Sequence, residues 1–121
     1  MYELTVESEF SAAHRLREYQ GACEQLHGHN WRVEMVVAGE KLTDLGLLMD
    51  FRDLKHILRA ATDHLDHVFL NELPDFTRQN PTTENIARVV FQQCARQMPE
   101  GVRVKSVQVW ESAKASARYV E

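Results

Sequence analysis

The chain has 121 residues, of which 44% are hydrophobic, so it is long enough for one ordinary domain with a substantial core. Its formal net charge is −4, with acidic and basic residues interspersed, which argues against nucleic acid or an anionic membrane as the main partner. No apolar run approaches the length of a bilayer span and only two cysteines are present, so we expect no membrane span, no disulfide framework and a cytoplasmic protein.

Alternating apolar residues predict that the chain begins with a strand running from about Tyr2 to Phe10. Such an amphipathic start is unlike a signal peptide. A polar loop is expected over residues 15–25, and a second strand over residues 30–39.

Two helices are predicted next, because apolar residues recur there at helical spacing. The first has Asp50 as its N-cap, and its apolar residues are Leu54, Ile57, Leu58, Ala61 and Leu65. The second starts near Thr82 or Thr83 and ends before Pro99.

Two closing strands are predicted at residues 102–111 and 115–120. The order ββααββ indicates an α+β fold, in which a four-stranded antiparallel sheet carries two helices on one face. We expect residues 1–121 to form a single domain. Because so small a sheet leaves two edges exposed, we also expect the chain to form homo-oligomers.

Three histidines form the most informative pattern. His27 and His29 share one face of the second strand, because successive side chains on a strand alternate in direction. His14 falls on the apolar phase of the first strand if that strand stays extended through Ala12. Three imidazoles aimed at one point, with a fourth position open, are typical of catalytic zinc. The alternative is that a chance pair of buried histidines simply forms hydrogen bonds.

Cys23 lies four residues before His27, in the polar loop. Beside a dication, its thiol would shift toward thiolate and could act as a base or nucleophile. The alternatives are an ordinary loop cysteine, or a fourth zinc ligand that closes a structural site. Cys94 lies in the apolar stripe of the second helix, where we expect core packing.

Two further positions carry groups suited to chemistry. Asp66 precedes His67, and a carboxylate beside an imidazole can tune it for proton transfer, although a solvated helix end would look the same. Glu111 shares the phase of the apolar residues in its strand. It is either a solvated strand end or an inward anchor for a ligand with paired N–H donors.

Six segments, spread in order over nearly the whole chain, carry a resemblance. They are FSAAH at 10–14, CEQLHGH at 23–29, LDH at 65–67, LN at 70–71, NPTTEN at 80–85, and Glu111. Together they resemble the 6-pyruvoyltetrahydropterin synthase and 6-carboxytetrahydropterin synthase family. The resemblance implies the tunnelling fold, trimers whose sheets close into a barrel, hexamers of two stacked trimers, and an active site at a subunit interface.

The resemblance also implies roles for particular residues. It places Zn²⁺ on three histidines, proton transfer on three residues, and the pterin substrate on three more. The zinc ligands would be His14, His27 and His29; the proton-transfer residues Cys23, Asp66 and His67; and the substrate-binding residues Glu111, Thr82 and Thr83.

The spacing of three residues between Cys23 and His27 resembles the bacterial 6-carboxy-5,6,7,8-tetrahydropterin synthases of queuosine biosynthesis. The implied reaction converts 7,8-dihydroneopterin triphosphate to the 6-carboxy product, with loss of triphosphate and acetaldehyde. Glu24 adds the Glu-x2-His-Gly-His pattern of relatives that make 6-hydroxymethyl-7,8-dihydropterin for folate, so a second activity is an alternative. Glu24 could equally be a solvated loop residue.

Three other readings remain open at this level: a 6-pyruvoyltetrahydropterin synthase, a hydrolase that uses zinc-bound water, and a non-catalytic zinc-stabilised binding module. A substrate with three phosphates needs a local basic patch. The sequence does not choose among the basic residues available for it, Arg15, Arg17, Lys114 and Arg118.

Overall fold

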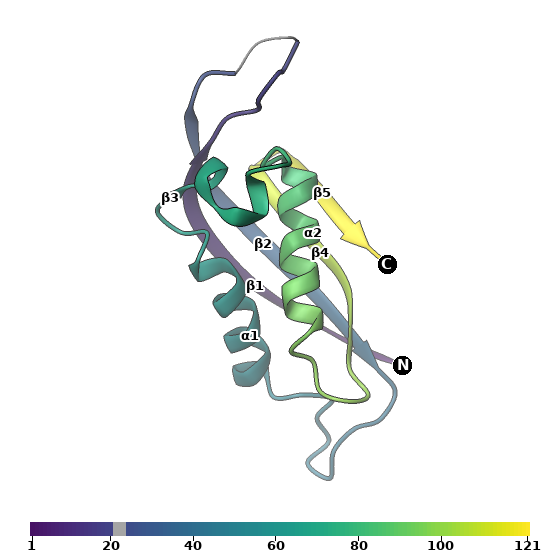
Figure 1. Cartoon of the computed structure of the whole chain (residues 1–121). Coiled ribbons are helices and arrows are strands. Elements are labelled where there is room, and N and C mark those ends of the chain that lie inside the picture. Colours follow the sequence, from purple (N-terminus) through teal and green to yellow (C-terminus); the bar gives the residue numbers. More distant parts are fainter. Residues whose placement is uncertain (21–23) are drawn as a thin grey trace.

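The computed structural model describes residues 1–20 and 24–121, which form a sheet with two helices side by side on one face (Figure 1). The strands and helices are β1 Tyr2–His14, β2 His27–Gly39, α1 Phe51–Asp63, β3 Val68–Phe69, α2 Thr83–Ala95, β4 Arg103–Ser112 and β5 Ala115–Val120. Two short 3-10 helices, η1 Leu70–Glu72 and η2 Pro74–Phe76, connect β3 to α2. The predicted α+β class and the ββααββ order of the long elements are confirmed.

The sheet has five strands in the order β3-β1-β2-β4-β5, one more than expected. The four long strands pair antiparallel, as predicted, but β3 makes the sheet mixed because it runs parallel to β1. Two residues, Val68 and Phe69, are too few to show a periodic pattern, which explains why the sequence did not reveal this strand.

The first two strands extend further than expected. β1 continues to His14 and β2 already begins at His27, because one unbroken register runs from Tyr2 opposite Gly39 to His14 opposite His27. Cross-strand hydrogen bonds thus keep the backbone extended beyond the alternating apolar residues. The three histidines that the sequence singled out therefore lie within these two strands, as expected from their phase.

The helices begin as predicted and end earlier. The carboxylate of Asp50 accepts a hydrogen bond from the Arg52 backbone N–H at 2.8 Å, so it caps α1. α1 ends at Asp63 rather than at Leu65, and α2 ends at Ala95.

The core lies between the sheet and the helices. Its fully buried side chains include Trp31, Val33, Met35, Val107 and Val109 from the strands and Leu54, Leu58, Ile86, Val90 and Cys94 from the helices. Burial raises the pKa of the Cys94 thiol to about 12. As expected, this cysteine is a core residue.

The opposite face of the sheet is polar. The Arg32 guanidinium donates to the Glu7 carboxylate at 2.7 Å and lies 4.7 Å from the ring centroid of Trp110. Within the described residues, β3 covers only the end of the outer edge of β1, and the outer edge of β5 pairs with no strand. Unpaired edges of this kind favour pairing with another chain.

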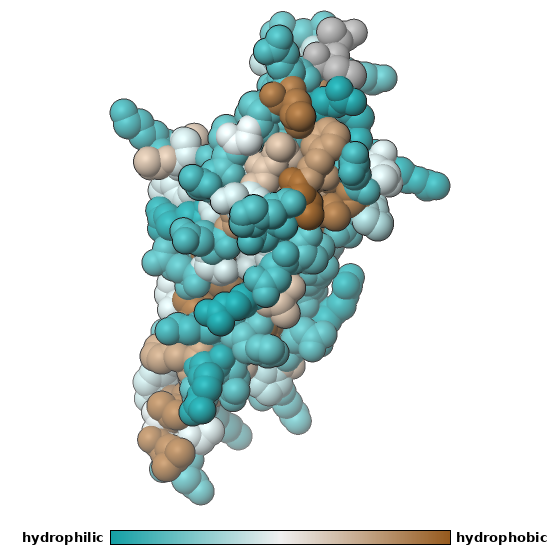
Figure 2. All heavy atoms as spheres, turned by 90° about the vertical axis from the view of Figure 1, so that its left-hand side faces the viewer, coloured by the Kyte–Doolittle hydropathy of each residue, from teal (hydrophilic) through white to brown (hydrophobic). Residues whose placement is uncertain are grey.

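Figure 2 shows the surface from the β1 side, where hydrophilic side chains dominate and apolar ones gather near the two ends. At one end, the segment between β2 and α1 exposes Leu42, Leu45 and Leu47. No helix in the described ranges is long and apolar enough to cross a membrane.

Candidate metal centre

The β1–β2 register brings the three histidines together at one end of the sheet. His14 lies directly opposite His27, and Ala12 lies opposite His29. The even-numbered side chains of β1 and the odd-numbered side chains of β2 share the face that the helices cover. His14 is almost fully buried, whereas His27 and His29 are partly exposed at the rim.

The ring nitrogens of these histidines converge on a carboxylate from β4. The Nε2 atoms of His14 and His27 are 3.0 Å apart. The Oε1 atom of Glu111 lies 2.9 Å from His29 Nε2, 3.3 Å from His14 Nε2 and 4.0 Å from His27 Nε2. All four ligand atoms lie within 4.8 Å of one another. Tetrahedral zinc separates its ligand atoms by about 3.3 Å, since Zn–N bonds are about 2.0–2.1 Å, so the spacing fits such an ion.

Backbone carbonyls fix which nitrogen of two rings carries the proton. His14 Nδ1 lies 2.8 Å from the Pro81 carbonyl oxygen, and His27 Nδ1 lies 2.9 Å from the Gln25 carbonyl oxygen. A carbonyl can only accept, so each Nδ1 donates its proton and each neutral ring keeps a lone pair on Nε2. Two lone pairs that face each other at 3.0 Å repel unless a cation or a proton lies between them.

The Nε2 atom of His29 is a second nitrogen whose surroundings suit a bound cation. This atom is buried and has no hydrogen-bond partner among the described residues, although a Glu111 oxygen lies 2.9 Å away. Burial lowers the pKa of His29 below 6.5, Glu111 opposes this shift, and His14 and His27 reinforce it. The neutral imidazole is the form that ligates metals. The residues present therefore fit a divalent cation held by imidazoles.

Trp31 forms the floor of this cluster. Its ring is fully buried and meets the rings of His14 and His29 edge to face, with centroids 4.9 and 5.2 Å apart. Its Nε1–H donates to the Ala12 carbonyl at 3.2 Å, and Phe10 stacks on its other side. Packing on several sides holds the imidazoles in fixed orientations, as an effective metal site requires.

Asp66 and His67 form a second reactive group beside β1. The Asp66 carboxylate accepts from the Ser11 N–H at 2.8 Å, and its other oxygen lies 3.0 Å from His67 Nδ1. The Ser11 hydrogen bond, assisted by the one from His67, lowers the pKa of the Asp66 carboxyl. His67 has a positive φ of 58°, and its ring is largely exposed. The ring is thus oriented by Asp66 with Nε2 free for proton transfer.

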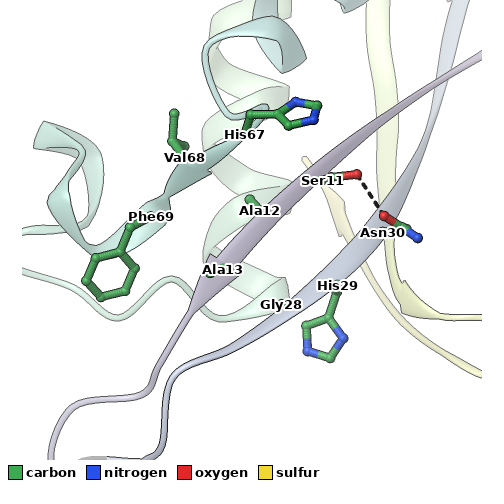
Figure 3. Close-up of a pocket in the computed structure, with 9 residues that line it drawn as sticks. All are labelled: Ser11, Ala12, Ala13, Gly28, His29, Asn30, His67, Val68 and Phe69. Atoms are coloured by element: carbon green, nitrogen blue, oxygen red, sulfur yellow. Dashed lines mark hydrogen bonds between the residues drawn. The ribbon is translucent and has the colours of Figure 1, made fainter.

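The two groups face different ways within one chain. An open cavity of about 470 Å³ spans the ends of β1, β2 and β3 and includes His29 and His67 in its lining. Figure 3 shows these two imidazoles on opposite sides of the β1–β2 pair, pointing away from each other. Within a single chain, His67 therefore does not act on a group bound at the histidine cluster.

The structure describes Thr82, Thr83 and Glu24 among the remaining residues that the sequence singled out. Thr82 caps α2, because its hydroxyl accepts from the Asn85 N–H at 3.1 Å, and Thr83 is the first residue of that helix. The Glu24 carboxylate lies 3.7 Å from His27 Nδ1, at the rim of the cluster. Cys23 lies outside the described residues.

Of the basic residues considered for phosphate binding, Arg17 is engaged within the fold. Its Nη2 atom donates to the carbonyls of Phe76 and Gln79. The guanidinium of Arg15 lies 5.9 Å from the Phe69 ring centroid.

Residues 3–121 match the family described as 6-pyruvoyl tetrahydropterin synthase. The chain belongs to this family. The 6-carboxy-5,6,7,8-tetrahydropterin synthase of Synechocystis sp. is 36% identical to it over 124 residues, which cover 98% of this chain and 93% of that relative. The dihydroneopterin monophosphate aldolase of Pyrococcus furiosus is 38% identical over 102 residues, which cover 84% of this chain and 82% of that relative.

The solved structures agree with this assignment. The 6-pyruvoyl tetrahydropterin synthase of Caenorhabditis elegans superposes with a TM-score of 0.82 at 25% identity, covering 100% of this chain and 97% of that one. The tunnelling fold expected from the resemblance is therefore confirmed, as is membership of an enzyme family.

Sequence reasoning missed three parts of the cluster: the nearness of Glu111 to the histidines, the two carbonyls that orient His14 and His27, and Trp31 as a floor. Trp31 shares the phase of His27 and His29, so its contact with them could have been anticipated. The place of Glu111 depends on the pairing of β2 with β4, in which Arg32 lies opposite Trp110. Nothing local in the sequence specifies that register.

Removal of one imidazole should remove the metal. We expect His29→Ala to lose most bound zinc, because two imidazoles cannot replace a three-nitrogen site. His56→Ala, on the exposed side of α1, is the control and should keep one zinc per chain. Metal content after gel filtration is the measurement. One full equivalent in His29→Ala would show that the ion is held elsewhere.

The low pKa of Asp66 predicts a pH dependence of stability. Its charged form is favoured in the folded state, so its contribution is present above the ordinary pKa of 3.8 and disappears as the pH falls through the lower, folded value. The midpoints of thermal unfolding of the wild type and of Asp66→Asn should therefore differ at pH 6 and converge toward about pH 3. A difference that stays constant across this range would contradict the prediction.

Proposed function

We propose that this chain is a zinc-dependent 6-carboxy-5,6,7,8-tetrahydropterin synthase of queuosine biosynthesis. Its substrate would be 7,8-dihydroneopterin triphosphate, which takes up water and loses triphosphate and acetaldehyde to leave a carboxyl group at C6. The observation that carries the proposal is the convergence of three imidazole nitrogens, two of them with their second nitrogen bonded to a carbonyl. The 36% identical Synechocystis relative of that name supports the choice of reaction.

His14, His27 and His29 would hold the ion. When bound, zinc supplies a Lewis acid that lowers the pKa of substrate hydroxyls and stabilises negative charge on their oxygens. Cys23, as thiolate, would remove a proton from the substrate side chain. His67 Nε2 would exchange protons on the opposite side, while the Asp66 carboxylate at 3.0 Å fixes the ring and stabilises its protonated form.

The opposite orientations of His29 and His67 support an active site shared between copies of the chain. The Asp66–His67 pair of one copy would face the histidine cluster of another. The open edges of β1 and β5 support assembly through the sheets, as a trimer or hexamer. We further propose that residues 1–121 are one cytoplasmic domain whose partners are its own copies and the pterin, not nucleic acid or membrane.

Glu111 is proposed to bind the pterin, with Thr82 and Thr83 nearby. A carboxylate matches the paired N–H donors of an aminopyrimidine edge, and charge-assisted bonds of this kind contribute about 1.5–3 kcal/mol each. The same carboxylate lies among the imidazoles, where it could instead serve as a fourth ligand of the ion. The two roles predict different effects of Glu111→Gln on the zinc content and on the affinity for a pterin.

A second candidate reaction is retro-aldol cleavage that gives 6-hydroxymethyl-7,8-dihydropterin. Two observations favour it: the name of the Pyrococcus furiosus relative, which is an aldolase, and the position of Glu24 at the rim of the cluster. A carboxylate 3.7 Å from a ligating imidazole is close enough to act as a base on a substrate held there.

The products made from 7,8-dihydroneopterin triphosphate decide between these reactions. The wild type should make the 6-carboxy product, and Cys23→Ala should lower that rate by about 10²–10⁴-fold while keeping the zinc. If the enzyme has both activities, Cys23→Ala keeps the hydroxymethyl product and Glu24→Ala loses it. Release of 6-pyruvoyltetrahydropterin by the wild type, or no turnover at full zinc occupancy, would refute the proposed reaction.

Glu111→Gln should weaken the binding of a pterin analogue by at least about tenfold and leave the zinc content at one per chain, because the neutral amide loses the charge-assisted bonds. Titration calorimetry and metal analysis give the two readouts. Loss of zinc without loss of pterin affinity would instead make Glu111 a metal ligand.

A further inference from the structure

Two asparagines each hold the backbone of one residue in the segment that leaves β1. Asn71 accepts from the Arg15 N–H at 3.0 Å and donates to the Arg15 carbonyl at 2.9 Å. Asn80 accepts from the Arg17 N–H at 2.9 Å and donates to the Arg17 carbonyl at 3.1 Å. Each amide thus replaces a neighbouring strand, since it donates and accepts as a backbone would. We call the two amides and their four hydrogen bonds the asparagine clamp.

The clamp is anchored in the fold. Asn71 is buried in η1, and the carbonyl of Asn80 accepts from the Asn85 amide in α2 at 2.8 Å. Arg17 adds a contact from its own side chain to the Gln79 carbonyl at 2.7 Å. The clamped segment therefore moves with the helix layer.

The clamp reaches the rim of the metal centre through one residue. Leu16 lies between the two clamped arginines, and its carbonyl accepts from the Glu24 N–H at 2.9 Å. The Glu24 carboxylate in turn lies 3.7 Å from His27 Nδ1. The four hydrogen bonds from the asparagine side chains to the backbone of Arg15 and Arg17 thus set the position of Glu24 relative to the histidines.

The backbone just beyond the clamp is strained. Glu18 and Gln20 have φ angles of 61° and 52°, a region that side chains other than glycine rarely adopt. Such conformations cost about 1–3 kcal/mol each and persist only where the surroundings impose them. Without the clamp, this stretch would relax and move the Leu16 carbonyl.

We propose that Asn71 and Asn80 are positioning residues, which act through Leu16 to hold the Glu24 carboxylate at the metal centre for the reaction. This rests on the second candidate reaction of the proposed function, the retro-aldol cleavage, because Glu24 acts as a base in that reaction. A displacement of about 1 Å at a reacting group can lower a rate by about 10²-fold, so a short clamp far from the substrate can control turnover.

The test uses amide-to-carboxylate exchanges that keep the side-chain shape. In Asn71→Asp and Asn80→Asp, an oxygen replaces the donating nitrogen and repels the arginine carbonyl. Gln92→Glu is the control, because it makes the same exchange of an amide for a carboxylate on the exposed side of α2, away from the metal centre. Each zinc-loaded protein is assayed for 6-hydroxymethyl-7,8-dihydropterin formed from 7,8-dihydroneopterin triphosphate, for zinc content, for thermal midpoint and for trypsin cleavage.

Both clamp variants should lower kcat by about tenfold to a hundredfold, with KM within about twofold, zinc at one per chain and a thermal midpoint that falls but stays above the assay temperature, because each exchange breaks a hydrogen bond. Trypsin should cut after Arg15 in Asn71→Asp and after Arg17 in Asn80→Asp, because each exchange frees the carbonyl of that bond. The control should behave like the wild type. A clamp variant that also carries Glu24→Ala should have the same kcat as Glu24→Ala alone, since the residues act on one step.

Three results would overturn the proposal: wild-type kcat in both clamp variants, a further full loss of kcat when Glu24→Ala is added to a clamp variant, or loss of zinc or unfolding at the assay temperature in parallel with the loss of kcat, which would indicate a purely structural role. If the wild type makes the 6-carboxy product but no hydroxymethyl product, the proposed function stands and this proposal is overturned; if it makes no pterin product, the proposed function fails. The cleavage pattern then still shows whether the clamp holds the segment.

Discussion

The pairing of β1 with β2 is the constraint on which the site depends. In this register His14 lies opposite His27, and the side chains of both point toward the helices. A shift of one residue would turn every side chain of one strand to the opposite face, which would expose Phe10 and send His14 away from its partners. The apolar contacts that fix the register are the same ones that build the core, so correct folding and assembly of the histidine cluster are one event.

That arrangement also explains why the cluster can hold a cation without collapsing. Trp31 and Phe10 fill the space below it, while carbonyls of Pro81 and Gln25 hold the far nitrogens of two rings. The cluster lies at the rim of the core rather than inside it, which keeps one side open to a substrate. The polar face of the sheet, by contrast, carries no helix and presents His67 outward.

The sequence predicted features whose cause is local. Alternation placed the long strands and put the three histidines on one face, and Asp50 was correctly identified as the cap of α1. It did not predict features whose cause is non-local. The strand β3 is too short to leave a pattern, and the approach of Glu111 to the histidines depends on the β2–β4 register. The opposite orientations of His29 and His67 follow from how the segment after α1 returns to β1, which no pattern in the sequence records.

X-ray absorption spectroscopy of the zinc-loaded protein tests the central claim most directly, because it reports which atoms bind the ion. The account predicts a first shell of nitrogen and oxygen ligands at about 2.0–2.1 Å, with three imidazoles and an exchangeable light atom. A sulfur ligand at about 2.3 Å would contradict it, because zinc would then be closed off by Cys23 in a structural site with no position left for a substrate.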